Sequence, residues 1–229
     1  GTKVIQGRMK KATQRAKGVK ALLAVHKGAK ALVNTGFRPQ AVWGLEAQGL
    51  APTALRRIRA LTAGMSGTRY PGGCATLAIR MAFGEDSDPL IYGRLNLFKE
   101  WMFTLEALSS QRKAVNTAWS RLAAQLKSSP RPWQKVKGSI SAVIAALLDI
   151  DWQPVSPSFW IDSDGEQFNL QSCDKDYLLE FALKGALSET VWRMAAKHHL
   201  GKGLEHGTDL TVLRRHPRAH RRRGQHGHA

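Results

Sequence analysis

The sequence predicts a mainly α-helical fold: a helical bundle with one small β-hairpin and a disordered basic C-terminal tail. Apolar residues recur at the three- and four-residue spacing of helices through most of the 229 residues. A pair of short apolar runs around a turn occurs once, in residues 158–170. Arginine and histidine dominate residues 213–229, where few side chains are apolar. We therefore divide the chain into a basic helical region (1–127), a helical subdomain with the hairpin (133–210) and the tail (211–229).

The N-terminal segment is expected to form a basic amphipathic helix from Lys3 to about Val33. Its apolar residues alternate spacings of four and three, which places them on one helical face: Ile5, Met9, Ala12, Ala16, Val19 and Leu23. Gly18 and Gly28 each weaken a helix by about 1 kcal/mol relative to alanine, so we expect the last turns to bend or fray. Residues 36–40, Gly-Phe-Arg-Pro-Gln, are expected to break the helical path.

After this break we expect a compact apolar plug and then a second basic helix. Residues 43–50 are mostly apolar and need a packing partner. Pro52 stands in a favourable first-turn position for a helix. That helix carries three arginines, Arg56, Arg57 and Arg59. Residues 65–73 are rich in glycine and proline but lack the Lys-Ser/Thr ending of a P-loop, so we interpret them as a connecting loop.

The middle of the chain is predicted to supply much of the core. Residues 74–83 are expected to form a short helix, and residues 89–127 one or two longer helices. The predicted buried stripe of the longer segment is Leu90, Leu95, Leu97, Phe98, Trp101, Met102, Leu105 and Leu108. Residues 128–132, Ser-Ser-Pro-Arg-Pro, are the clearest linker signal, and we place the boundary between the two helical regions there.

The second half is predicted to contain two helices with the hairpin between them. Residues 133–150 have helical periodicity, and the prolines that follow end this helix. The hairpin of residues 158–170 contains an Asp-Gly pair, which favours a tight turn. Asp174 can cap a final helix of residues 175–198. Its expected inward residues are Leu178, Phe181, Ala182, Ala186, Val191, Met194 and Ala195.

Positive charge is concentrated at the two ends of the chain. The formal net charge is +18, of which residues 1–70 carry +13 and residues 193–229 carry +7, whereas residues 71–192 carry −2. Such a distribution favours a polyanionic partner, although a basic amphipathic helix also suits an anionic lipid surface. The expected phosphate contacts are Lys3, Arg8, Lys10, Lys11, Arg15, Lys17, Lys20, Arg56, Arg57, Arg59, Arg214, Arg215, Arg218, Arg221, Arg222 and Arg223.

Metal-binding patterns are incomplete in this sequence. A calcium loop starting at Asp162 needs glycine at its sixth position and glutamate at its twelfth, where this chain has Gln167 and Cys173. The acidic hairpin is therefore interpreted as a turn. His216 and His220 have the spacing of half a zinc finger, but the Cys-x2-Cys half is missing. We expect no catalytic residue, metal or cofactor in this segment, and both cysteines are expected to be reduced.

The ends and the apolar runs of the chain bear on its location. The longest unbroken apolar run, Ala142–Leu148, is far shorter than the roughly 20 residues that span a bilayer. No signal peptide precedes the basic helix, so we expect a nuclear or cytoplasmic protein that is not secreted. The first residue is glycine, which indicates a piece of a longer chain.

Residues 3–70, and more loosely the chain to about residue 210, resemble the segment after the polymerase palm in non-LTR (LINE-type) retrotransposon reverse transcriptases. The resemblance lies in the basic helix, in Gly-Phe-Arg-Pro-Gln-Ala-Val-Trp-Gly-Leu-Glu at residues 36–46, and in Leu-Arg-Arg-Ile-Arg at residues 55–59. Two later pieces resemble a divergent branch of these elements: Arg-Tyr-Pro-Gly-Gly-Cys at residues 69–74 and Phe-Trp-Ile-Asp-Ser-Asp-Gly at residues 159–165.

The resemblance implies a role next to a polymerase rather than catalysis. The Tyr/Phe-x-Asp-Asp metal-binding motif of these enzymes is absent from the chain, so the catalytic carboxylates and their Mg²⁺ would belong to an upstream palm. This chain would then be the thumb and connection region, with the palm and an RNA–DNA hybrid or duplex as partners. A thumb holds a duplex by its backbone, which requires lysine and arginine on helices.

The sequence leaves three functional hypotheses. The first is a non-catalytic segment of an RNA-directed DNA polymerase that holds the primer–template backbone. The second is a stand-alone basic helical module that binds an acidic partner or anionic lipid. The third is a degenerate ribonuclease-H-like nuclease, in which Glu180 and Glu189 join Asp162 and Asp164 around metal ions.

Overall fold

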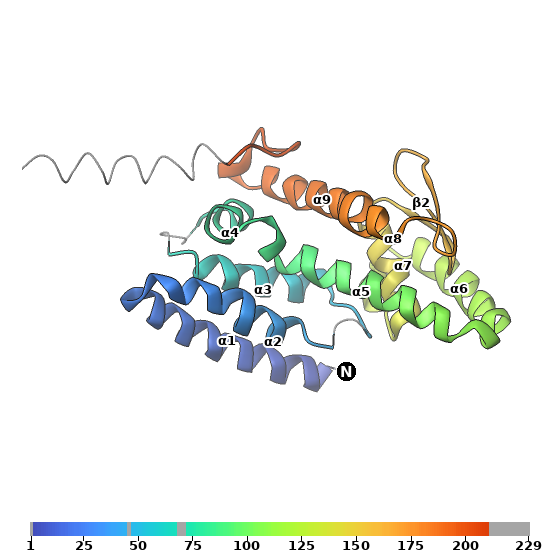
Figure 1. Ribbon diagram of the computed structural model, residues 1–229, viewed down its shortest axis with the longest axis horizontal. Coiled ribbons are helices and arrows are strands. Elements are labelled where there is room, and N and C mark those ends of the chain that lie inside the picture. The colour runs from blue at the N-terminus through green and yellow to red at the C-terminus, as the bar shows by residue number, and fades with distance from the viewer. Residues whose placement is uncertain (1, 45–46, 68–71, 211–229) are drawn as a thin grey trace, which may run out of the picture.

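The computed structural model describes residues 2–44, 47–67 and 72–210, and these residues form a mainly helical fold with one small sheet (Figure 1). The α-helices are α1 (Thr2–Val25), α2 (Arg38–Val42), α3 (Pro52–Gly64), α4 (Ala75–Phe83), α5 (Pro89–Ala107), α6 (Arg112–Lys127), α7 (Ser139–Asp149), α8 (Lys175–Tyr177) and α9 (Lys184–Ala196). The 3-10 turns are η1 (Lys27–Lys30), η3 (Glu85–Ser87), η4 (Ser109–Gln111), η5 (Pro132–Gln134) and η7 (His199–Gly201), and the π-helical segments are η2 (Val33–Phe37) and η6 (Leu178–Leu183). The predicted fold class is confirmed, and the predicted tail lies outside the described residues.

The N-terminal helix is confirmed, but its break lies elsewhere than expected. The chain leaves α1 at His26, whose backbone is extended, and turns through η1. It then returns beside α1 as η2 and α2 (Figure 1). The break expected at residues 36–40 is therefore wrong, because these residues are helical. Pro39 is tolerated since it lies in the first turn of α2, where a missing N–H removes no hydrogen bond within that helix.

A central helix, α5, organises the rest of the bundle. It contacts α3, α7, α9 and η6 (Figure 1). Its residues Leu97, Phe98 and Trp101 are buried, as predicted from the apolar stripe. The predicted start of α3 at Pro52 is confirmed, and η4 separates α5 from α6.

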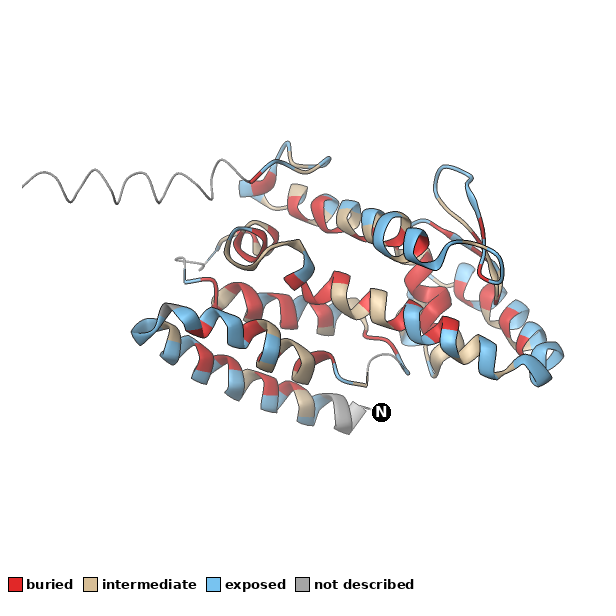
Figure 2. Ribbon diagram, in the orientation of Figure 1, coloured by how far each residue is buried: buried red, intermediate tan, exposed pale blue. Residues whose placement is uncertain are grey.

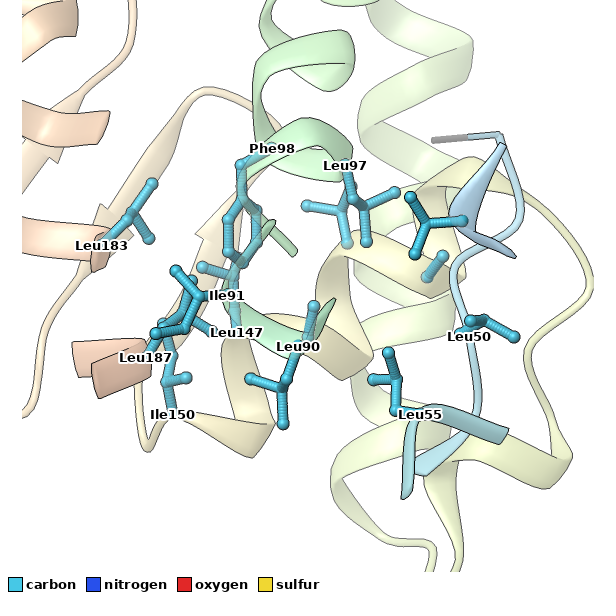
Figure 3. Packing of buried hydrophobic residues seen from close by; sticks show 14 of the residues in the cluster. Leu50, Leu55, Leu90, Ile91, Leu97, Phe98, Leu147, Ile150, Leu183 and Leu187 are labelled. Carbon is cyan, nitrogen blue, oxygen red and sulfur yellow. The ribbon is translucent and has the colours of Figure 1, made fainter. Parts of the chain in front are cut away.

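Side chains from distant parts of the chain converge on this helix. Leu50 and Leu55 approach from one side and Leu183 and Leu187 from the other (Figure 3). Leu50, at one end of the predicted apolar plug, is buried in this cluster, whereas Trp43, at the other end, is 69% exposed. The plug is therefore packed only in part. The same hydrophobic cluster contains residues from both sides of the proposed linker at 128–132.

The sheet has three strands, where the sequence predicted one hairpin. The predicted hairpin is confirmed as β2 (Phe159–Ile161) and β3 (Gln167–Asn169), which pair antiparallel. The additional strand is β1 (Gln153–Ser156), in a segment where we expected proline only to end a helix. β1 lies at the edge of the sheet, where Pro154 pairs with Trp160. Because proline has no backbone N–H to donate, it is tolerated in an edge strand but not in a central one.

The final helical segment is continuous but contains a π-helical turn. Asp174 caps it as predicted: its Oδ1 accepts hydrogen bonds from the backbone N–H groups of Asp176 (2.9 Å) and Tyr177 (3.1 Å). Phe181 was expected to face inward but is 69% exposed. The wider turn of η6 adds a residue to the helical repeat, so Leu183 takes the buried position.

No helix within residues 2–44, 47–67 and 72–210 is long and apolar enough to cross a membrane.

Candidate nucleic-acid interface

The solvent-exposed side of α1 carries several cations. Lys10, Lys11, Arg15, Lys17 and Lys20 are exposed. On the opposite face the helix buries four of its six predicted apolar residues, Met9, Ala12, Ala16 and Val19 (Figure 2). Leu23 is partly buried, and the side chain of Ile5 lies outside the described part of the structure. The amphipathic pattern thus fixes which way the cations point.

The spacing of these cations suits a regular polyanion. Lys10 and Lys17 are seven residues apart, which is two turns and about 10.5 Å along the helix axis. Lys3 stands seven residues before Lys10, although its side chain lies outside the described part of the structure. A strand of B-DNA advances 3.4 Å per nucleotide along its axis, so Lys10 and Lys17 would be about three nucleotides apart along a duplex that lies parallel to α1.

Two arginines of α1 face the returning helical segment and hydrogen-bond to it. Arg8 Nη1 donates to the backbone carbonyl of Trp43 (2.6 Å), and Arg15 Nη1 donates to that of Gly36 (3.1 Å). Carbonyl acceptors orient a guanidinium without neutralising it. The two hydrogen bonds therefore hold the guanidinium groups in place without pairing them with a carboxylate.

In the part of the chain that the structure describes, no carboxylate pairs with a cation of this face. Within the described residues, the basic members of the ion pairs are Arg59, Arg80, Arg94, Lys175, Lys184 and Arg193. These basic residues lie on α3, α4, α5, α8 and α9, and none of them belongs to α1. A face of one sign raises the local concentration of a polyanion.

The three arginines of α3 divide into two groups. Arg56 and Arg57 are exposed, and Arg56 lines a hollow with Leu90 and Met194 rather than with residues of α1. Arg59 is only 4% exposed and pairs with Asp88 at 2.9 Å. Arg59 is therefore not available to a phosphate, and we leave it out of the interface. The arginines of the tail, Arg214, Arg215, Arg218, Arg221, Arg222 and Arg223, lie outside the described residues.

A second cationic surface was not anticipated from the sequence. A groove of about 600 Å³ between α6 and the start of α7 is lined by Arg121, Lys135 and Lys137, among other residues. Lys135 and Lys137 stand directly before α7, whose N-terminus favours anions. The sequence predicts that this helix starts at residue 133, which would place both lysines inside it, so their position before its N-terminus was missed. Arg121 could not be anticipated either, since only the packing of α6 on α7 places it there.

The acidic hairpin has the geometry of a turn. Asp162 Oδ1 accepts hydrogen bonds from the backbone N–H groups of Asp164 (2.9 Å) and Glu166 (2.8 Å). The carboxylate thereby stabilises the loop between β2 and β3. In the part of the chain that the structure describes, no group of three or more His, Cys, Asp or Glu side chains could hold a metal ion.

Comparison with known proteins gives no relative from which to read a function. No protein-family model matches the chain, and no curated protein and no solved structure matches it significantly.

Proposed function

We propose that this chain holds nucleic acid by its phosphate backbone, without catalysis and independently of base sequence. The observation that carries the proposal is the cationic face of α1, whose exposed lysines and arginines take part in no ion pair among the described residues. Affinity would come from neutralising phosphates and releasing their counterions. The resemblance to reverse transcriptases suggests that the duplex is a primer–template and that an upstream palm supplies the catalysis.

Two glycines on the same face support close approach of a backbone. Gly7 and Gly18 are exposed and eleven residues, about three turns, apart. A Cβ at either position would meet nothing within 4 Å, so packing inside the protein does not require glycine there. Glycine in a helix costs stability relative to alanine but lets another backbone come close. The cations and the glycines thus favour the same occupant.

The proposal is tested by binding to a labelled RNA–DNA hybrid across a salt series. The double variant Lys10→Gln/Lys17→Gln removes two cations from the face. Each lost phosphate contact should lower the slope of log K against log salt by about 0.9, so the slope should fall by about 1.8. The control, Lys99→Gln/Lys197→Gln, removes the same charge from exposed positions on α5 and directly after α9 and should leave the slope close to that of the unaltered protein. Equal slopes for the two variants would contradict a site on α1.

The same series also separates the competing hypotheses. Removal of residues 213–229 should leave a steep salt dependence if the helices hold the duplex. If the full chain binds vesicles of anionic lipid or an acidic peptide but not the hybrid, the interaction-module hypothesis replaces ours. If the chain cleaves the hybrid with Mg²⁺ or Mn²⁺, and Asp162→Asn abolishes the cleavage, the nuclease hypothesis replaces ours.

A further inference from the structure

An exposed tryptophan adjoins the cationic face of α1. Trp43 directly follows α2 and is 69% exposed. The guanidinium carbon of Arg8 lies 5.2 Å from the centre of its indole ring, within the range of a cation–π interaction. Arg8 Nη1 also donates a hydrogen bond to the Trp43 carbonyl at 2.6 Å. The arginine thus contacts both the ring and the backbone of one residue, while most of the tryptophan surface faces solvent.

The backbone after the tryptophan fits this arrangement. Gly44 has a positive φ of 72°, a conformation that glycine adopts at no steric cost. A Cβ at this position would lie 3.0 Å from Arg8 Nη2. Glycine therefore lets the guanidinium lie against the chain beside the indole ring.

The charges near the ring distinguish it from another exposed aromatic residue of the protein. Phe181 is also 69% exposed, but its ring stacks on that of Tyr177, with ring centres 6.0 Å apart, and no cation–π contact is made to it among the described residues. Trp43 instead adjoins Arg8. Lys11 and Arg15 follow Arg8 at spacings of three and four residues, which are those of neighbours on one helical face.

We propose that Trp43 is a stacking platform for an unpaired nucleobase, so that the site takes a single-stranded stretch whose phosphates lie along Arg8, Lys11 and Arg15. This inference rests on the proposed function and specifies its ligand. Aromatic side chains beside a basic groove bind single strands in this way, because every base has a π-face while the cations follow the backbone. A cation over one side of the indole and a base on the other would leave both faces of the ring occupied.

The test compares three labelled ligands: a blunt RNA–DNA hybrid, the same hybrid with a single-stranded overhang, and the single strand alone. The stacking contribution known for such platforms predicts that Trp43→Ala weakens binding of the overhang and the single strand by roughly 5- to 150-fold. Binding of the blunt hybrid should change by less than about twofold. Trp43→Phe keeps an aromatic face and should retain most of the affinity. Phe181→Ala removes an equally exposed ring elsewhere and should change none of the three.

A spectroscopic signal reports stacking directly. With 2-aminopurine in the overhang, binding of the unaltered protein should quench the fluorescence of the base, and Trp43→Ala should remove this quenching at saturating protein. If the blunt hybrid binds through α1 but Trp43→Ala changes neither overhang affinity nor quenching, the stacking inference is wrong and the proposed function stands. If Trp43→Ala weakens all three ligands equally, the platform is also excluded. If no ligand binds, both the inference and the proposed function fail.

Discussion

The carboxylate of Asp88 pairs with the guanidinium of Arg59 inside the helical bundle. Arg59 Nε lies 3.0 Å from both carboxylate oxygens, and Nη2 lies 2.9 Å from Oδ2. Asp88 Oδ1 also accepts a hydrogen bond from the N–H of Leu90 and thereby caps α5. Arg59 Nη2 donates to Thr76 Oγ1 on α4 at 2.8 Å. One ion pair therefore joins α3, α4 and the start of α5.

Replacing Arg59 with methionine should destabilise the fold strongly. Asp88 is fully buried, so the substitution leaves a carboxylate without its charge partner, which costs about 3–5 kcal/mol. The control is Arg57→Met on the same helix, where an exposed side chain is replaced and the change should stay within about 0.5 kcal/mol. Urea denaturation measures both free energies of unfolding. A cost below about 1 kcal/mol for Arg59→Met would show that the pair does not stabilise the bundle.

A second ion pair should show strong coupling between its members. Arg94 Nη2 lies 2.8 Å from Asp149 Oδ2, and Trp133 Nε1 donates to the same carboxylate. Burial lowers the pKa of Arg94 to about 10 and raises the pKa of Asp149. In both cases desolvation outweighs the attraction of the partner charge. Burying the pair therefore costs free energy. Replacing only one of the two residues should destabilise the fold more than replacing both with apolar side chains.

A double-mutant cycle measures this coupling. Arg94→Met and Asp149→Leu should each lower the free energy of unfolding by about 3 kcal/mol, since each leaves one charge unpaired. The double variant should cost no more than one single variant, because an apolar pair of similar volume replaces the ion pair. Costs that simply add in the double variant would contradict coupling between the two residues.

Elements set by local periodicity could be predicted, whereas features that depend on distant partners could not. The helix of residues 2–25, the start at Pro52 and the turn of the hairpin each follow from spacing or turn chemistry within a few residues. Strand β1 could not be recognised, because its pairing with β2 compensates for a proline that locally opposes a strand. The exposure of Phe181 depends on a π-helical turn that no local signal indicated.

The candidate interface shows the same division. Exposure of Lys10 and Lys17 follows from the amphipathic pattern of α1. Arg59 stands four residues after the buried Leu55 and so shares its helical face, which could have marked Arg59 as inward. Its partner, however, is 29 residues away in sequence, a distance at which spacing carries no information. The contact between Arg8 and Trp43 likewise requires the chain to fold back at η1.

Gly49 should be hard to replace because both its backbone and its surroundings require glycine. Its φ is +64°, and a Cβ there would lie 2.9 Å from the ring of Trp133 and 3.0 Å from Ala142 Cβ. Gly49→Ala should therefore cost about 1–2 kcal/mol for the left-handed backbone, and overpacking should add about 1–3 kcal/mol. Gly67→Ala is the matched control: φ is +76° with nothing within 4 Å, so only the backbone cost applies. Equal thermal stabilities of the two variants would contradict tight packing around Gly49.

Gly18 offers a prediction in which stability and binding change in opposite directions. It lies inside α1 with open space around it, so Gly18→Ala should stabilise the protein by about 0.5–1 kcal/mol through helix propensity. If the outward face of α1 holds a nucleic-acid backbone closely, the added methyl group should nevertheless weaken binding to the RNA–DNA hybrid. Gly185→Ala, on α9, is the control, since it also has open space around it and should stabilise without affecting binding. A Gly18→Ala protein that is more stable and binds the hybrid as tightly as before would show that the glycine is not needed for close approach.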